Sequence, residues 1–283
     1  MADFSNFSTH GGIEKNAKFI TSDIEKKLKL KIKKPKSKDE IFIIFLKSLL
    51  KIELVDYFIC YKNSILTGLL FKLTGSKLII RINNSPESYL YWNKLKSLIS
   101  HFLKIKLVKS EIMIFNSKRI MNFYKLFSEG NKNLFFLENN YFFDPIEINL
   151  SKRNKIYIAS RISWEKNLLE TYKILKSIAK DIDYEISAYS NTKIKNLGIK
   201  NFETLEYNFN DIYISLSFFE GMPNMVFQAL FKGSALLLSN CWSHVEIYNL
   251  LSNFGLENRI HLISEDFQEE STLINEIQIL KEQ

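Results

Sequence analysis

The chain has 283 residues, 46% of them hydrophobic and 25% charged, and a net charge of +8. This composition excludes a disordered chain, and two cysteines are too few for a disulfide framework, so we expect a folded protein of a reducing compartment. The length is sufficient for two modest domains.

The charge is unevenly divided along the chain. Residues 1–150 carry 25 Lys and Arg against 14 Asp and Glu, a net +11, whereas residues 151–283 carry 14 against 17, a net −3. Residues 139–154 lack any periodicity and contain Pro145, so the sequence predicts two domains, 1–150 and 151–283. The basic first half is compatible with an anionic membrane surface, a lipid-phosphate substrate or nucleic acid.

No signal peptide or transmembrane helix is predicted, because the start is polar and the most apolar stretch, residues 41–61, is interrupted by charges. We therefore expect a cytoplasmic protein that associates at most peripherally with the inner face of a membrane.

The first half alternates predicted helices and strands. Gly11 and Gly12 precede a helix expected over residues 13–29; they either let a phosphate approach the backbone or form an ordinary flexible entry. A basic run, residues 26–38, either is a solvated face or touches lipid headgroups. The elements predicted next are a buried helix 41–50, strand 57–61, helix 64–73, strand 78–82, helix 92–109, strand 111–115, helix 118–127 and strand 134–137. Such alternation favours a parallel sheet.

Two features of this half bear on function. Asn83 and Asn84 follow a strand, where parallel sheets bind ligands, and their amides can bind sugar hydroxyls but cannot act as a general base near neutral pH. The basic amphipathic helix 92–109 either packs on the core or lies on a membrane surface. Its His101 is interpreted as structural.

The second half begins with a strand predicted at 155–159 and a helix at 168–178. Arg161 and Lys166 lie between them, five residues apart and just before the helix N-terminus. Arg offers a fork of donors and Lys a point charge, so the pair could clamp a diphosphate. A strand at 184–188 and a weak strand at 202–205 are expected next.

Residues 211–240 are predicted to form a strand, a tight turn, a helix over 225–232 and a second strand over 235–238. Gly233 is expected to end the helix, and Glu220 lies in the turn beside the helix N-terminus. Free N–H groups and the positive dipole end suit an anionic or oxygen-rich ligand there.

A helix over 241–251, a strand over 259–263 and a helix over 267–281 complete the second half. Ser243 and Glu246 have the spacing of a capping box. Cys241 and His244 have half of a zinc pattern without a second pair, so no metal is expected.

Together these segments resemble a known family. Glu220 and Gln228, separated by seven residues, lie in S-x-x-E-G-M-P-N and A-L-x-x-G segments, and residues 160–167 match G-R-x4-K-N except for Ser160. These are similar to motifs of family-4 retaining glycosyltransferases, whose second Glu of E-x7-E is replaced here by Gln228. Asn83 and Asn84 stand where many members have a His.

The resemblance implies an α/β protein of the GT-B fold, with two Rossmann-like parallel-sheet domains facing a cleft and a first strand that is missing or very short. It implies catalytic roles for Glu220, Arg161 and Lys166. The implied nucleotide-sugar-binding residues are Gly11, Gly12, Arg161, Lys166, Gly221, Met222, Pro223, Asn224 and Gln228, with Asn83 and Asn84 on the acceptor side.

The implied reaction transfers a hexose or N-acetylhexosamine from a UDP- or GDP-sugar to a glycan or lipid-linked acceptor. Retention of configuration, no cofactor or metal, and a place in bacterial surface-polysaccharide or lipopolysaccharide synthesis follow from the resemblance. One alternative is a catalytically degenerate domain acting as a binding or scaffold protein, given Gln228 and Ser160. Another is a basic nucleic-acid-binding module, although no helix-turn-helix, zinc finger or aromatic RNA-binding motif supports nucleic acid as a partner.

Overall fold

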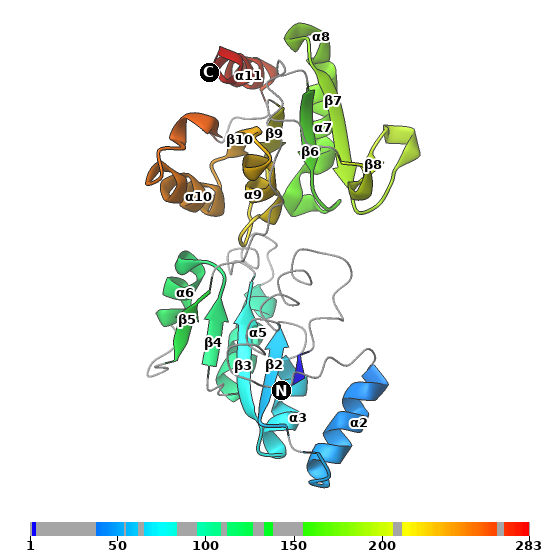
Figure 1. The fold of residues 1–283 in the computed structure, drawn as a ribbon, viewed down its shortest axis with the longest axis vertical. Helices are drawn as coiled ribbons and strands as arrows, with labels where there is room; N and C mark the ends of the chain where they lie inside the picture. Colours follow the sequence, from blue (N-terminus) through cyan, green and yellow to red (C-terminus); the bar gives the residue numbers. More distant parts are fainter. Residues whose placement is uncertain are drawn as a thin grey trace. The chain divides into compact units, whose positions relative to one another are not determined.

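The computed structural model of the protein describes residues 2–3, 38–53, 55–61, 65–83, 95–108, 112–126, 133–137, 155–205, 211–264 and 269–282. The chain forms two compact units, Met1–Asn140 and Tyr141–Gln283, each built on a parallel sheet (Figure 1). The predicted boundary segment, the helix at 13–29 and most of the basic run 26–38 lie outside the described residues. No helix in the described ranges is long and apolar enough to cross a membrane.

The first unit contains a five-stranded sheet in the order β1-β2-β3-β4-β5. Its strands are β1 (Ala2–Asp3), β2 (Tyr57–Tyr61), β3 (Lys77–Ile82), β4 (Ile112–Phe115) and β5 (Leu134–Phe136), and its helices are α2 (Lys38–Leu49), α3 (Ile65–Leu73), α5 (Leu95–Val108) and α6 (Lys118–Lys125). Within the described residues β1 pairs with β2 over two residues, Ala2 and Asp3.

The core of this unit forms between the sheet and its helices. β3 is buried from Leu78 to Ile82 and is apolar there except for Arg81, which is typical of a strand covered on both faces. Phe58 of β2 stacks on Phe71 of α3 with ring centroids 4.3 Å apart. His101 of α5 is buried and hydrogen-bonds the Tyr124 hydroxyl at 2.6 Å, which supports its structural interpretation.

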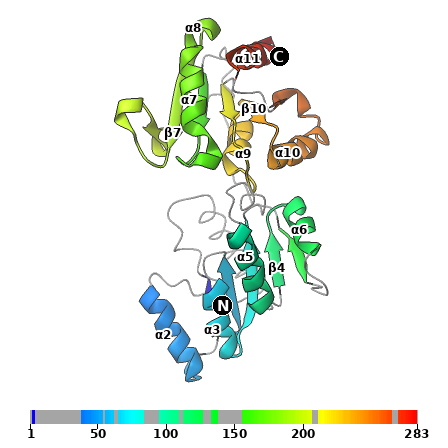
Figure 2. The same ribbon diagram turned by 180° about the vertical axis from the view of Figure 1, so that it is seen from behind.

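The helix expected at 41–50 exists, but the prediction that it is buried is wrong. Phe42 and Ile43 of α2 are 59% and 50% exposed, whereas Ile44 is buried. The segment is apolar on several faces, and α2 lies at the edge of the described part of its unit (Figure 2). Ile44 belongs to the core, and Ile41 and Phe45 pack against it. The hydrophobic pattern predicted the helix correctly but did not predict how much of it is exposed to solvent.

The second unit contains a six-stranded parallel sheet in the order β11-β10-β9-β6-β7-β8. Its strands are β6 (Lys155–Ala159), β7 (Glu185–Ser190), β8 (Lys200–Asn201), β9 (Ile212–Ser215), β10 (Ala235–Ser239) and β11 (Ile260–Ile263), and its α-helices are α7 (Leu168–Ser177), α8 (Ala179–Ile182), α9 (Asn224–Phe231), α10 (Trp242–Ser252) and α11 (Glu270–Glu282). The strand expected at 202–205 is wrong: a 3₁₀ helix, η5 (Phe202–Thr204), follows the two-residue β8.

Two apolar clusters cover the two faces of this sheet. Alternate strand residues such as Ile158 and Ile214 pack with α7 and α11, while Tyr157 and Tyr213 pack with α9 and α10. The chain proceeds outward from β6 to β8 on one side and from β9 to β11 on the other. The topological switch point therefore lies between β6 and β9, and doubly wound sheets bind ligands beyond the carboxyl ends of such strands.

Candidate active site

The two loops that leave β6 and β9 at this switch point are joined to each other. The β6 loop leads into η3 (Trp164–Lys166), and the Phe218 N–H of the β9 loop donates to the Glu165 carbonyl at 3.0 Å. Trp164 stacks on Phe218 with ring centroids 5.0 Å apart. Asn167 adopts a left-handed conformation at φ 51° and turns the chain into α7. These contacts hold the two loops together, so their polar side chains lie in one place.

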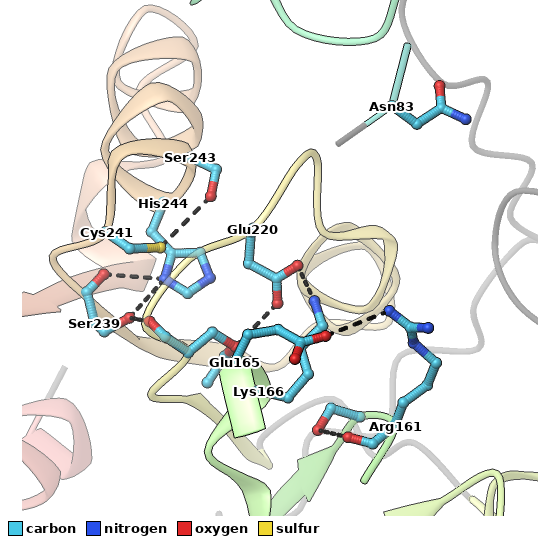
Figure 3. A network of polar contacts seen from close by, with 12 residues as sticks. Asn83, Arg161, Glu165, Lys166, Glu220, Ser239, Cys241, Ser243 and His244 are labelled. Carbon is cyan, nitrogen blue, oxygen red and sulfur yellow. Dashed lines mark hydrogen bonds and ion pairs between the residues drawn. The ribbon is translucent and has the colours of Figure 1, made fainter. Parts of the chain in front are cut away.

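Lys166 of the β6 loop and Glu220 of the β9 loop form a buried ion pair (Figure 3). Lys166 Nζ contacts Glu220 Oε2, and the two side chains are 16% and 8% exposed. The Ser217 hydroxyl donates to Glu220 Oε1 at 2.9 Å. Burial alone would raise the pKa of Glu220, but the charges of Lys166 and His244 and the hydrogen bonds from Lys166 and Ser217 hold that pKa below its usual value.

Arg161 lies beside this pair and is more open to solvent. Its side chain is 57% exposed, and Nη2 lies 3.8 Å from Glu165 Oε1. The structure thus brings Lys166 and Glu220 into direct contact and leaves the Arg161 guanidinium at the surface of the same loop, where an anion could reach it.

The N-terminus of α9 follows Glu220 directly. Pro223 is the N-cap, and Asn224 begins the helix. Gly221 and Met222 are half-buried. Gln228 lies one turn into α9 and is also half-buried.

Three expected site residues, Gly11, Gly12 and Asn84, lie outside the described residues. Asn83 is at the carboxyl end of β3 in the first unit, where its Oδ1 accepts from Arg81 Nε at 3.0 Å. Asn116 Nδ2 donates to the Asn83 carbonyl at 3.5 Å. Asn83 therefore belongs to a polar cluster at the end of the first sheet.

A second polar cluster behind Glu220 was not assigned to the site by the sequence. Ser239 ends β10, Cys241 is the N-cap of α10, and His244 lies in the first turn. The capping-box assignment of Ser243 was therefore wrong: Ser243 is helical and 1% exposed. The neighbouring order of β9 and β10 is the signal that would have placed these side chains near Glu220.

Cys241 and His244 perturb each other. Burial alone would raise the pKa of Cys241, but the charge of His244 and the neighbouring Ser243 hydroxyl lower it to about 7. Burial opposes the charge of His244, yet Cys241 and Glu220 raise its pKa above the usual value. In the described part of the chain, no group of three His, Cys, Asp or Glu could hold a metal ion.

Comparison with known proteins identifies the fold. No protein-family model and no curated protein matches the sequence. Among solved structures, TarM matches with a TM-score of 0.60 and 12% identity over 86% of this chain and 53% of TarM. Anabaena HepE, in complex with UDP and glucose, matches with a TM-score of 0.55 and 10% identity over 91% of this chain and 78% of HepE. The pneumococcal O-GlcNAc transferase GtfA, in complex with UDP and GlcNAc, matches with a TM-score of 0.52 and 12% identity over 82% of this chain and 51% of GtfA.

These proteins are GT-B glycosyltransferases. The chain has the GT-B fold. The expected α/β fold class is thereby confirmed, and each unit contains one parallel sheet. The chain spans about half the length of TarM and of GtfA.

Proposed function

We propose that the chain is a glycosyltransferase of the family-4 type. It takes a hexose or N-acetylhexosamine from a UDP- or GDP-sugar and transfers it with retention of configuration. The observation that carries this proposal is the buried Lys166–Glu220 pair at the switch point of the second sheet. The UDP and sugar complexes of HepE and GtfA, which share the fold, support a nucleotide-sugar donor.

The leaving diphosphate would be stabilised by fixed positive charge. Lys166 and Arg161 are adjacent to the N-terminus of α7, and both can donate to phosphate oxygens. A diphosphate then competes with Glu220 for Lys166. Gly11 and Gly12 would add backbone donors. Since these groups supply the charge stabilisation, the proposal requires neither a metal nor a cofactor.

The donor sugar would lie beside Glu220. Because the pKa of this carboxyl is lowered, Glu220 is an anion near neutral pH and accepts hydrogen bonds from sugar hydroxyls. The backbone of Gly221, Met222, Pro223 and Asn224 would shape the pocket at the α9 N-terminus. Gln228 would bind the ribose hydroxyls through its amide.

The acceptor would be a glycan or a lipid-linked sugar bound by the first unit, with Asn83 and Asn84 among its contacts. The net charge of +11 on residues 1–150 suits an anionic surface, so we place the protein at the cytoplasmic face of a bacterial membrane, in surface-polysaccharide or lipopolysaccharide synthesis. Flotation with liposomes of anionic lipid tests this location, and a protein that stays in the dense fraction contradicts it.

Calorimetry of the full chain with UDP, GDP, UDP-glucose, UDP-GlcNAc and GDP-mannose tests the donor assignment. We expect one nucleotide sugar to bind, and Lys166→Ala to weaken its binding at least about tenfold through loss of a charged hydrogen bond. Lys173→Ala is the matched control, because Lys173 is 66% exposed on the adjacent α7 and pairs with Glu170. That control is expected to bind as the wild type does.

Other outcomes would favour the alternatives. A folded wild type that binds no nucleotide sugar indicates a degenerate domain, and equal affinity for duplex DNA indicates a nucleic-acid-binding module. With donor and acceptor known, NMR of the first-formed product determines whether configuration is retained. Activity that persists in a chelator supports metal independence, and loss of activity contradicts it.

A further inference from the structure

A fully buried histidine lies behind Glu220, and the proposed reaction does not use it. His244 is 0% exposed, and its Nε2 is buried without a hydrogen-bond partner among the described residues. Figure 3 shows the ring between Ser239 and Glu220, with the second nitrogen on the side that faces Glu220. An unpartnered buried polar atom destabilises the folded state, so its retention here points to a function.

The hydrogen bonds of the ring identify its proton. The Ser239 hydroxyl donates to the Ser217 carbonyl at 2.5 Å, so its oxygen can only accept from the histidine. His244 Nδ1 lies 3.1 Å from that oxygen and 3.0 Å from the Ser239 carbonyl, which also accepts. Nδ1 therefore carries a proton, so a second proton on the ring would be at Nε2, on the Glu220 side.

A relay of contacts joins this ring to Glu220 through Ser217, which accepts with its backbone carbonyl and donates with its side-chain hydroxyl. His244 donates to Ser239, Ser239 donates to the Ser217 carbonyl, and the Ser217 hydroxyl donates to Glu220 Oε1 at 2.9 Å. These residues come from α10, β10 and the loop after β9. Glu220 is thus held by Lys166 at Oε2 and by a relay that begins at His244 at Oε1.

Among the described residues, two acidic groups act on His244: Cys241, the N-cap of α10, and Glu220, on the loop after β9. Lys166 of η3 lies beyond Glu220. Both acidic groups raise the pKa of His244 against its burial, which favours the imidazolium, while the charge of His244 in turn lowers the pKa of Glu220.

We propose that His244 is a positioning residue, whose imidazolium holds the Glu220 carboxylate from its buried side through Ser239 and Ser217 and through its own charge. This inference rests on the proposed function, in which a donor diphosphate draws Lys166 away from Glu220. Without a second cation, Glu220 would then be a buried carboxylate stabilised by one hydroxyl. His244 keeps it ionised and oriented toward the sugar.

The variant His244→Asn separates this role from a purely structural one. The Asn amide reaches the position of Nδ1 and keeps the bond to Ser239, but it removes the charge and Nε2. His261→Asn is the matched control, since His261 of β11 is half-buried and pairs with Glu276 at 3.2 Å. Ser239→Ala is a second test if His244→Asn does not fold, because it breaks the relay and leaves the imidazole.

The first readout does not depend on any nucleotide. The carboxyl carbon of Glu220, labelled with ¹³C and assigned by its loss in Glu220→Gln, is titrated by NMR in the full chain. We expect His244→Asn or Ser239→Ala to raise the titration midpoint of Glu220, and His261→Asn to leave it unchanged. A midpoint in His244→Asn equal to that of the wild type would overturn the proposal.

The second readout is donor affinity. We expect His244→Asn to weaken UDP-glucose binding about tenfold, as for the loss of one hydrogen bond to a charged group, and to leave the affinity for UDP unchanged. Wild-type UDP-glucose affinity should also fall as pH rises through the pKa of His244, a dependence that His244→Asn lacks. Equal losses for UDP and UDP-glucose would contradict positioning of a sugar-binding carboxylate. If the wild type binds no nucleotide sugar, the proposed function fails, while the NMR titration still decides the role of His244.

Discussion

At the scale of single residues, the site depends on how a buried carboxylate is kept charged. Glu220 is buried, and Lys166, Ser217 and His244 stabilise its ionised form. Removing one partner of a buried pair costs more than the pair contributes, because the other charge is left uncompensated. The chemistry of this site is therefore tied to the stability of the second unit.

Lys166→Met is expected to lower the free energy of unfolding at pH 7 by about 3 kcal/mol, because Glu220 stays buried without its main cation. In the wild type the pKa of Glu220 is lowered, so its contribution is present above pH 4.5 and is lost as pH falls through the folded value. The difference in the free energy of unfolding between the wild type and Lys166→Met should consequently become smaller in acid. Urea unfolding at several pH values measures it, and Lys173→Met is the exposed control.

Cys241 should titrate near neutrality in the native protein. The ultraviolet absorbance of its thiolate, measured in a Cys60→Ser background, is expected to rise with a midpoint of about 7. In His244→Asn the midpoint should move above the usual thiol pKa of 9.0, since the buried thiolate then lacks a compensating positive charge. An unchanged midpoint in the variant would show that His244 is not the cause.

At the scale of elements, the unit that carries Glu220 depends on a sharp end to α9. Gly233 adopts φ +86°, and the Ser234 N–H donates to the Ala229 carbonyl at 3.0 Å, so the chain turns at once into β10. Residues with a Cβ atom rarely adopt this backbone conformation. The glycine thereby fixes where β10 begins, and with it the place of Ser239.

Gly233→Ala is expected to cost about 1–2 kcal/mol of stability, because alanine is strained in the left-handed region. Lys232→Ala at the same helix end is the control, since its φ of −84° suits alanine. Thermal unfolding monitored by circular dichroism compares the two. Equal midpoints would contradict the assigned backbone conformation.

At the scale of the whole molecule, each unit has its own sheet and core. The apolar cluster of the first unit joins residues 41–134, and the two clusters of the second join residues 156–280. Units with separate cores generally fold separately. The Lys166–Glu220 pair and the His244 relay lie entirely within the second unit.

A fragment of residues 141–283 should therefore fold by itself with one cooperative urea transition. Under the proposed function it should still bind the nucleotide, but more weakly than the full chain, because Gly11 and Gly12 are absent. Intrinsic fluorescence and calorimetry test both expectations, with the full chain as reference. A fragment that remains unfolded would show that the second core needs the first unit.

The sequence by itself determined the kinds of elements and much of the second sheet. Alternating apolar runs and turn residues predicted most strands and helices to within a few residues, because burial of a parallel strand and of a helix face leaves a local pattern. It also placed Lys166 and Glu220 in loops that follow strands, as the β6 and β9 loops show. It failed for the 3₁₀ helix at Phe202–Thr204, where a short apolar run has no period to read.

Only the tertiary structure decided which side chains meet. Strand order makes β9 the neighbour of both β6 and β10, so Lys166, Glu220 and His244 converge from segments far apart in the chain. It also left Phe42 of α2 exposed and made Cys241, rather than Ser243, the cap of α10. Depth and contact depend on packing between elements, and a local pattern of residues does not contain that information.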